Sequence, residues 1–183
     1  MLSLTGRLLL ATPRLVDPNF ARAVIFMLNH DDDGALGVVI NRPTGRPLAD
    51  VLPSWSGVVT VPQLLFTGGP VAQDSALAVG VSAADGPVTG FRRVTGDYGL
   101  VDLEAAPDEL AGLLVGFRVF SGYAGWSPGQ LEAELREGSW YVVEALPTDV
   151  LHPDPEHLWR SVLRRQPGEL RYVSLYPDDP TLN

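Results

Sequence analysis

Hydrophobic residues run almost without interruption through two segments near the N-terminus, residues 23–29 and 36–41. Both segments are rich in β-branched side chains, and the polar turn between them contains Asp33-Gly34, a pair typical of hairpin turns. An antiparallel strand with one face in water alternates apolar and polar positions, and these two segments do not. The pattern therefore predicts a β-hairpin that is covered on both faces and lies at the centre of the core.

The rest of the chain alternates short apolar segments with turns rich in glycine and proline. Strands are predicted over residues 6–12, 63–71, 75–80, 116–125 and 139–146, and one or two more over residues 92–103 with a break at Gly96-Asp97. Helices are predicted over residues 47–52, 107–114, 127–138 and 154–165. The run 116–146 resembles a strand, helix, strand crossover. We expect one α+β domain over residues 1–183 with a mainly antiparallel sheet, and a loose tail over residues 176–183.

The charge pattern limits the possible partners of the protein. The formal net charge is −9, and all thirteen residues counted as Lys or Arg are arginine. Nucleic-acid binding needs a basic stripe that neutralises phosphates, so the composition argues against it. The absence of lysine also excludes Schiff-base and P-loop lysine chemistry. A protein or a small molecule is therefore the expected partner, and no cofactor is expected.

The chain contains no cysteine, which excludes disulfides, thiolate catalysis and Cys-ligated zinc. This composition suits a reducing compartment. Near the N-terminus the apolar run covers only residues 8–11, which is too short for a signal-peptide core or a membrane span. The predicted location is the cytoplasm, without membrane contact.

Ser127 lies in the sequence Gly-Trp-Ser-Pro-Gly, which fits the G-x-S-x-G pattern of serine hydrolases. In that motif the residue after the nucleophile donates its N–H to the oxyanion, but Pro128 has none. Losing one such donor costs roughly 3 kcal/mol in the transition state. The same letters predict a helix start, with Ser127 as N-cap, Pro128 in the first turn and Gln130 completing a capping box. We therefore predict no catalytic residue. A hydrolase using Ser127, with a downstream aspartate and histidine, remains the alternative.

Two groups of residues contain side chains that commonly bind metal ions, but neither group has the spacing that a metal site needs. A calcium-binding loop that begins at Asp31 needs glutamate at its twelfth position, where Arg42 stands. His152 and His157 are five residues apart, which is not the spacing that places two ligands on one helical face. No metal site is predicted.

Three turn-rich motifs form the predicted binding surface. Their polar, glycine and aromatic residues follow strands, where sheets often present ligand groups. As alternatives, the first motif is a strand terminator, the second an ordinary turn, and Trp126 a core residue. The candidate residues are Asn41, Arg42, Pro43, Gly68, Gly69, Pro70, Gly122, Tyr123, Gly125 and Trp126.

The same motifs carry a family resemblance. Residues 8–43, "FTGGPV" at 66–71, and "GYAGWSPGQLEAEL" with "SWYVVEA" at 122–145 are similar in order and wording to the YqgE/AlgH family of bacterial proteins. The resemblance covers nearly the whole chain, although the C-terminal "YPDDPTLN" departs from it. It implies a single α+β domain whose sheet curls into a partial barrel with flanking helices.

The resemblance implies no established activity. Some members are labelled transcriptional regulators because of an effect on alginate production, which does not require DNA contact. Three functions therefore stand at this point: a non-catalytic binding or regulatory module, a hydrolase-type enzyme, and a transcriptional regulator that contacts DNA. The turn-rich, aromatic motifs without an acid-base pair favour the first.

Overall fold

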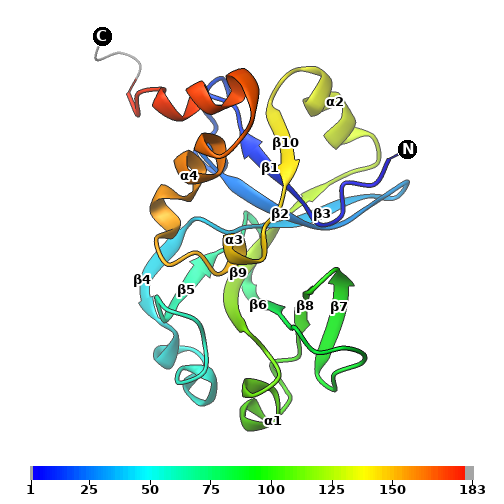
Figure 1. The fold of residues 1–183 in the computed structure, drawn as a ribbon, viewed down its shortest axis with the longest axis vertical. Coiled ribbons are helices and arrows are strands. Elements are labelled where there is room, and N and C mark those ends of the chain that lie inside the picture. The colour runs from blue at the N-terminus through cyan, green and yellow to red at the C-terminus, as the bar shows by residue number, and fades with distance from the viewer. Residues whose placement is uncertain (1, 180–183) are drawn as a thin grey trace.

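The predicted central hairpin is formed by β2 (Val24–Asp31) and β3 (Gly34–Val39), which pair antiparallel in the computed structural model (Figure 1). The model describes residues 2–179. The first five residues of β2 and the last three of β3 are buried, and their side chains alternate between two hydrophobic clusters on opposite faces. The prediction of a hairpin covered on both faces is confirmed.

The described strands form one ten-stranded sheet with the order β10-β1-β2-β3-β9-β6-β8-β7, to which β5 and β4 are joined through β9. Every strand pairing is antiparallel except that of β5 with β9. The remaining strands are β1 (Arg7–Ala11), β4 (Pro43–Pro47), β5 (Leu64–Thr67), β6 (Val71–Val81), β7 (Phe91–Thr95), β8 (Tyr98–Val101), β9 (Gly116–Trp126) and β10 (Trp140–Glu144).

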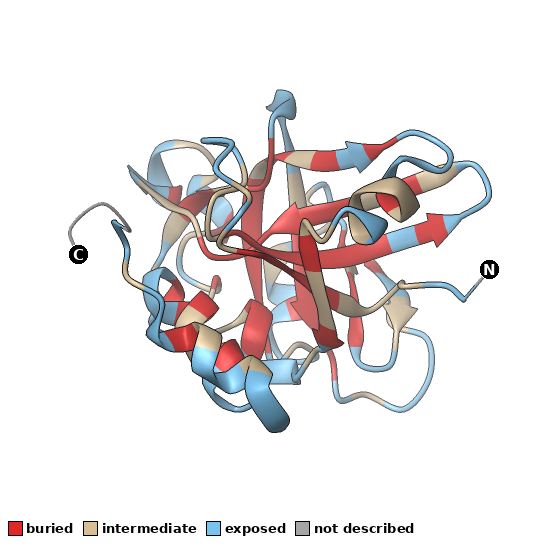
Figure 2. Ribbon diagram, turned by 90° about the horizontal axis from the view of Figure 1, so that it is seen from above, coloured by how far each residue is buried: buried red, intermediate tan, exposed pale blue. Residues whose placement is uncertain are grey.

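The sheet curls strongly. Phe26 on β2 and Tyr98 on β8 lie with their ring centroids 4.4 Å apart, although three strands separate β2 from β8 in the sheet order. Only a curled sheet brings these rings together, so the α+β fold with a partial barrel is confirmed. The concave side encloses the largest hydrophobic cluster, and Figure 2 shows the buried residues concentrated in the central strands.

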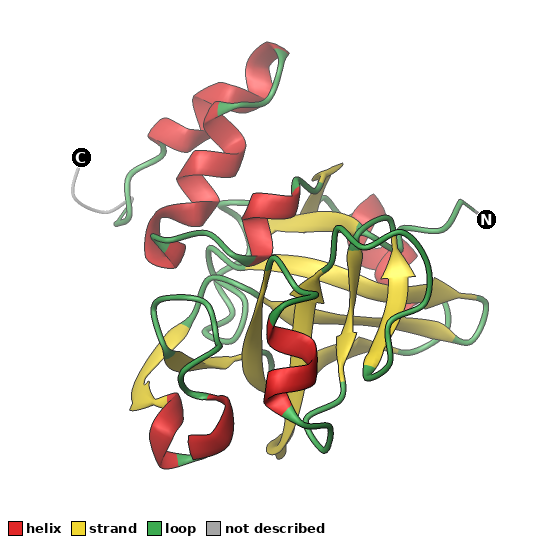
Figure 3. Cartoon of the chain, turned by 60° about the horizontal axis from the view of Figure 1, so that its bottom comes forward, coloured by secondary structure: helices red, strands yellow, loops and turns green. Residues whose placement is uncertain are grey.

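Helices lie around the outside of the strands (Figure 3). Leu131 of α2 packs on the outer face of β1, β2 and β3, whereas Leu110 of α1 packs beside β6, β8 and β9. The buried stripe of α4 joins the inner cluster of the barrel. The α-helices are α1 (Pro107–Ala111), α2 (Gln130–Arg136), α3 (Pro147–Val150) and α4 (Leu158–Arg164), and the 3-10 helices are η1 (Leu48–Asp50), η2 (Pro53–Trp55), η3 (Pro155–His157) and η4 (Gly168–Leu175).

The predicted strand, helix, strand unit exists as β9, α2 and β10, but its two strands are not neighbours. They run in the same direction with β3, β2 and β1 between them. The connection can span this width because α2 crosses the outer face of those strands and buries Leu131 against them.

The C-terminal segment beyond η4 crosses back to the start of β2. Arg22 donates hydrogen bonds to the carbonyls of Tyr176 and Pro177, and Asp178 forms an ion pair with Arg160 of α4. Within the segment predicted as a loose tail, residues 176–178 therefore have defined contacts, and residues 180–183 lie outside the described part of the chain. Within residues 2–179 no helix has the length and apolarity needed to cross a membrane.

An ion pair between a buried carboxylate and a partly exposed arginine fixes the end of the barrel that α3 and α4 cover. Asp149 is fully buried, and its carboxylate accepts hydrogen bonds from Arg165 at 2.6 and 2.7 Å and from the Leu146 N–H at 2.6 Å. Arg165→Gln is expected to lower the free energy of unfolding by about 3 kcal/mol, because it leaves a buried carboxylate without its cation. Urea unfolding followed by tryptophan fluorescence measures this.

The matched control is Arg164→Gln, since the Arg164 side chain is exposed and has no hydrogen bond or ion pair among the described residues. Its cost should stay below about 0.5 kcal/mol. Equal effects of the two substitutions would contradict the role assigned to Arg165.

Candidate functional site

Ser127 lies in a turn between β9 and α2. The helix begins at Gln130, and Gly129 before it has φ 77° and ψ −7°. With Pro128 at the second position and a 3.0 Å hydrogen bond from the Gln130 N–H to the Ser127 carbonyl, the geometry is that of a type II turn. The predicted N-cap role of Ser127 is therefore wrong, because the left-handed glycine delays the helix. Half of the capping box does form, since Gln130 Oε1 accepts the Ser127 N–H at 3.0 Å.

The serine has no catalytic surroundings in the described residues. It is exposed, and no hydrogen bond joins its hydroxyl to a histidine. His157 Nδ1 contacts the Asp154 carboxylate at 2.8 Å, and buried His30 contacts Glu132 through Nε2 at 2.8 Å. Pro128 still removes the N–H that an oxyanion would need.

The glycine motifs of β5 and β9 meet at their backbones. The Gly68 N–H donates to the Ser121 carbonyl at 2.8 Å, and a Cβ on Gly68 would lie 2.3 Å from the Gly122 oxygen. A Cβ on Gly69, at φ 152°, would lie 2.2 Å from the carbonyl of Tyr123. A Cβ on Gly122, at φ 71°, would lie 2.5 Å from the Gly69 oxygen. These glycines therefore allow two segments, distant in sequence, to touch along their main chains.

The Asn41-Arg42-Pro43 motif belongs to the same region, because the Arg42 carbonyl accepts the Thr67 N–H at 2.9 Å and Pro43 pairs with Phe66. The buried Asn41 amide holds the segment that follows β3 against the start of β2. Its Oδ1 accepts the Val24 N–H and its Nδ2 donates to the Arg22 carbonyl, each at 2.9 Å.

Arg42 supports the loop that precedes β2. Its guanidinium donates to the carbonyls of Pro18 at 3.0 Å, of Asn19, and of Ala21 at 2.8 Å. Burial lowers the pKa of this guanidinium, and the nearby Asp17 partly offsets the effect. Because three carbonyls converge on one fork, Arg42 holds the loop 17–22 in place.

The three sequence motifs therefore converge, and part of them reaches the surface. Gly68, Gly69 and Gly122 are buried, whereas Pro70 and Gly125 are exposed and Tyr123 is half-buried. Next to them β6 leaves its pairing with β9 between Val71 and Ala76, and residues 71–76 are all exposed. We call Pro70, residues 71–76, Tyr123 and Gly125 the bulge surface.

Trp126 lies in the core, on the outer face of the sheet. It is 7% exposed and packs edge to face with Trp140. The indole N–H groups of Trp126 and Trp140 both donate to Glu134 Oε2, at 2.9 and 2.8 Å. One carboxylate of α2 thus satisfies two buried tryptophans, as the core interpretation of Trp126 requires.

Arg118 is a fully buried cation near the start of β9. It donates to the carbonyls of Val150 at 2.9 Å, Val61 at 2.7 Å and His152 at 2.6 Å, and it lies 4.8 Å from the ring centroid of Phe66. Burial lowers the pKa of its guanidinium to about 10, so it stays charged at neutral pH. It therefore ties three loop carbonyls to the sheet instead of facing a ligand.

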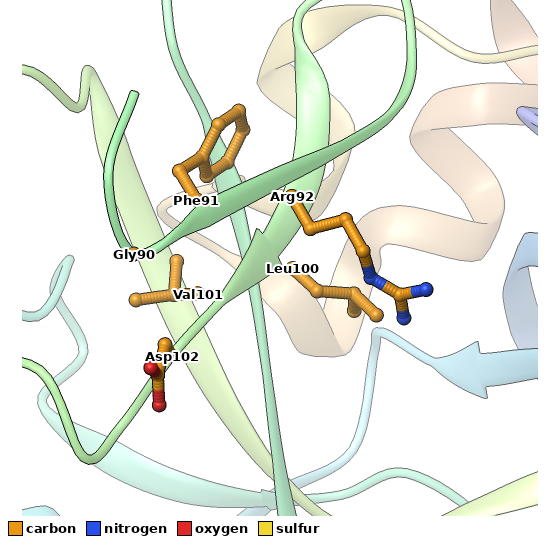
Figure 4. A pocket seen from close by; sticks show the side chains of 6 residues that line it. All are labelled: Gly90, Phe91, Arg92, Leu100, Val101 and Asp102. Atoms are coloured by element: carbon orange, nitrogen blue, oxygen red, sulfur yellow. The ribbon is translucent and has the colours of Figure 1, made fainter. Parts of the chain in front are cut away.

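A hollow of about 350 Å³ lies at the β7–β8 ribbon (Figure 4). Phe91 and Arg92 point to opposite sides of β7, and Arg92 extends alongside Leu100. Asp102 already accepts the Glu104 N–H at 2.9 Å. The hollow thus lies on the β7–β8 ribbon. Its lining residues do not include an acid and a base that hydrogen-bond to each other. Elsewhere in the described residues, histidine and acidic side chains do not gather into a group of three that could hold a metal ion.

Sequence reasoning missed the arginines that organise this protein. Arg118 interrupts the apolar strand sequence "GFRVF", which was a visible signal. Arg22 and Arg160 had no such signal, because they come together only when the loop before β2, α4 and the C-terminal segment pack on one another.

Known proteins resemble this chain over almost its full length. Residues 8–171 match the model of a family described as AlgH-like. A UPF0301 protein of Streptomyces avermitilis is 58% identical over 99% of this chain and 96% of its own, and one of Thermobifida fusca is 47% identical over 100% and 96%. A crystal structure from Corynebacterium diphtheriae matches with TM-score 0.88 and 37% identity over 92% and 90% of the two chains. The solution structure of AlgH from Pseudomonas aeruginosa matches with TM-score 0.71 and 28% identity over 97% and 96%.

Proposed function

Because the chain belongs to the AlgH-like family and its three motifs meet beside the central strands β3 and β9, we propose that it is a non-catalytic binding module that engages a protein partner through the bulge surface. The observation that carries the proposal is the bulge itself, where residues 72–75 leave the ladder between the paired Val71 and Ala76, and residues 71–76 are all exposed. Bulges often lie next to functional sites, where they re-aim side chains.

Backbone strain supports the same surface. Ala72 has φ 47°, in the left-handed region that costs a residue with a Cβ about 1 kcal/mol. Strain of this kind persists only where the surroundings impose it, and it gathers at functional positions. Ser121 of β9 anchors the bulge, since its hydroxyl donates a hydrogen bond to the Gln73 carbonyl.

The bulge surface combines apolar and polar groups. Val71 is 39% exposed, and Gln73 and Asp74 follow it on the same exposed segment. A mixed surface with an aromatic neighbour, Tyr123, suits recognition of another protein. Neither the hydrolase nor the DNA-contact alternative has a supporting observation among the described residues. The cytoplasmic location stays a prediction.

The test compares partner capture by the wild-type protein with capture by Val71→Asp. The substitution places a charge on the bulge surface and should remove the captured partner. The melting temperature should fall only slightly, because Val71 is 39% exposed and belongs to none of the three hydrophobic clusters. Capture from a bacterial lysate, identification of the partner, and a binding assay with the purified partner provide the measurement.

Asp50→Asn is the control, since Asp50 is exposed on η1. It should retain the partner. If Val71→Asp binds the purified partner as tightly as the wild type does, the bulge surface is not the binding site.

A further inference from the structure

Two arginines from different parts of the chain face one carboxylate. Arg160 of α4 places Nη2 2.7 Å from Asp178 Oδ1, and Arg22, just before β2, places Nη1 3.9 Å from the same oxygen. The two arginine side chains are each 27% exposed, whereas the Asp178 side chain is 86% exposed. The cations are thus set into the protein, and the anion lies on the outside.

The Arg22 backbone is held in a strained conformation. Its φ is 59°, and Asn41 Nδ2 holds its carbonyl at 2.9 Å. The guanidinium carbon lies 4.1 Å from the ring centroid of Trp159, which is itself fixed by a hydrogen bond to the Ala11 carbonyl. A left-handed backbone is unfavourable for a residue with a Cβ, so the surrounding residues impose this position on Arg22.

Each arginine uses one nitrogen for the backbone of the C-terminal segment. Arg22 Nη2 donates to the carbonyls of Tyr176 and Pro177, and Arg160 Nη1 donates to the carbonyl of Ser174. The other nitrogen of each fork points toward Asp178. The Asp178 side chain can therefore rotate away without releasing the segment that carries it.

Asp178 does not satisfy both forks. Arg22 Nη1 is buried and has no hydrogen bond among the described residues, and 3.9 Å is too long for one to Asp178. Burial, followed by repulsion from Arg160, lowers the pKa of the Arg22 guanidinium. The Asp178 carboxylate therefore leaves the buried Arg22 Nη1 donor unpaired, and an unpaired buried donor destabilises the fold.

Space adjoins the cluster on both sides. One hollow of about 160 Å³ is lined by Thr12, Arg22 and Tyr176, among others. A second hollow of similar size is lined by Arg22, Asn41, Glu156, His157, Trp159, Arg160 and Asp178. His157 adds a third basic group, paired with Asp154, while Glu156 forms no ion pair with either arginine in the described structure.

We propose that Arg22 and Arg160 form a binding site for the phosphoryl group of a small molecule, and that Asp178 occupies this site as an intramolecular substitute. A phosphoryl dianion balances the charges of both arginines. Its terminal oxygens can accept hydrogen bonds from both guanidinium groups, whereas the Asp178 carboxylate accepts one only from Arg160. The proposal uses other residues than the bulge surface and does not rest on it.

The test titrates the full-length protein with inorganic phosphate at about pH 7.5 and constant ionic strength, where the group is mostly dianionic because its second pKa is ~6. The Nε–H signals of the arginines in ¹H–¹⁵N spectra report binding. Asp178→Asn should bind phosphate on the order of 10-fold more tightly than the wild type, because the competing carboxylate is gone. Asp50→Asn changes the net charge equally and should leave the affinity unchanged.

Arg160→Gln in the Asp178→Asn background should abolish binding, whereas Arg46→Gln should not, since the exposed Arg46 side chain has no partner in the described structure. Arg22→Gly keeps the left-handed backbone accessible and should also abolish binding in a folded protein. Glycerol 3-phosphate forms a second arm: tighter binding than phosphate assigns the site to a phosphomonoester, and equal binding assigns it to free phosphate.

The proposal is overturned if Asp178→Asn binds phosphate no more tightly than the wild type, since the arginines would then only anchor the C-terminal segment. It is also overturned if binding survives in Arg160→Gln or if sodium chloride at the same ionic strength produces the same shifts.

Discussion

Gly69→Ala is expected to prevent stable folding, with a loss of more than about 4 kcal/mol in the free energy of unfolding. The added Cβ would lie 2.2 Å from the Tyr123 carbonyl carbon and oxygen, and φ 152° disfavours any residue with a Cβ. Neither strand can move aside, because the Gly68 N–H bonds to Ser121 and the Gly68 carbonyl accepts the Val39 N–H. Soluble yield, circular dichroism and urea unfolding measure the effect.

Gly125→Ala, in the same sequence motif, is the matched control. Gly125 has no positive φ, and its Cβ would meet only the Tyr123 ring at 3.5 Å, an ordinary contact. The cost should stay within about 0.5 kcal/mol. A Gly69→Ala protein as stable as Gly125→Ala would mean that the two backbones do not touch.

Arg118→Met is expected to lower the free energy of unfolding by about 3 kcal/mol. Methionine fills much of the volume, but it leaves the carbonyls of Val61, Val150 and His152 without their donor. The Val150 hydrogen bond is buried and the other two are partly buried, and an unpaired buried group costs about 1–3 kcal/mol. Removing a buried charge without an acidic partner offsets part of this cost. Urea unfolding of the two proteins, followed by the tryptophan fluorescence, measures the difference.

Arg46→Met provides the comparison, because the Arg46 side chain is exposed on β4. It should change the stability by less than about 0.5 kcal/mol. If Arg118→Met is as stable as the wild type, the desolvation cost of the guanidinium equals the value of its three hydrogen bonds.

The candidate site could be predicted only in part. The motifs at Asn41, Gly68 and Gly122 are visible in the sequence because they follow predicted strands, where sheets often present ligand groups, and the structure brings their backbones together. Their accessibility was not predictable, since buried and exposed glycines look alike in a sequence. The start of α2 was misplaced for a similar reason: Ser-Pro-Gly suits a helix start and a type II turn equally well, and Gly129 adopts the second.

The sequence by itself determined the fold class and most of the local elements, because apolar periodicity, hairpin turns and proline positions act over a few residues. It did not predict β4, α3 and η4. The uninterrupted apolar runs already placed the central hairpin in the core. Tertiary structure alone decided which distant residues meet. The curl places Phe26 against Tyr98, the crossover passes three strands, and Arg22 lies beside Arg160 and Asp178. These contacts depend on how strands and helices pack across the whole chain, and no local pattern records that packing.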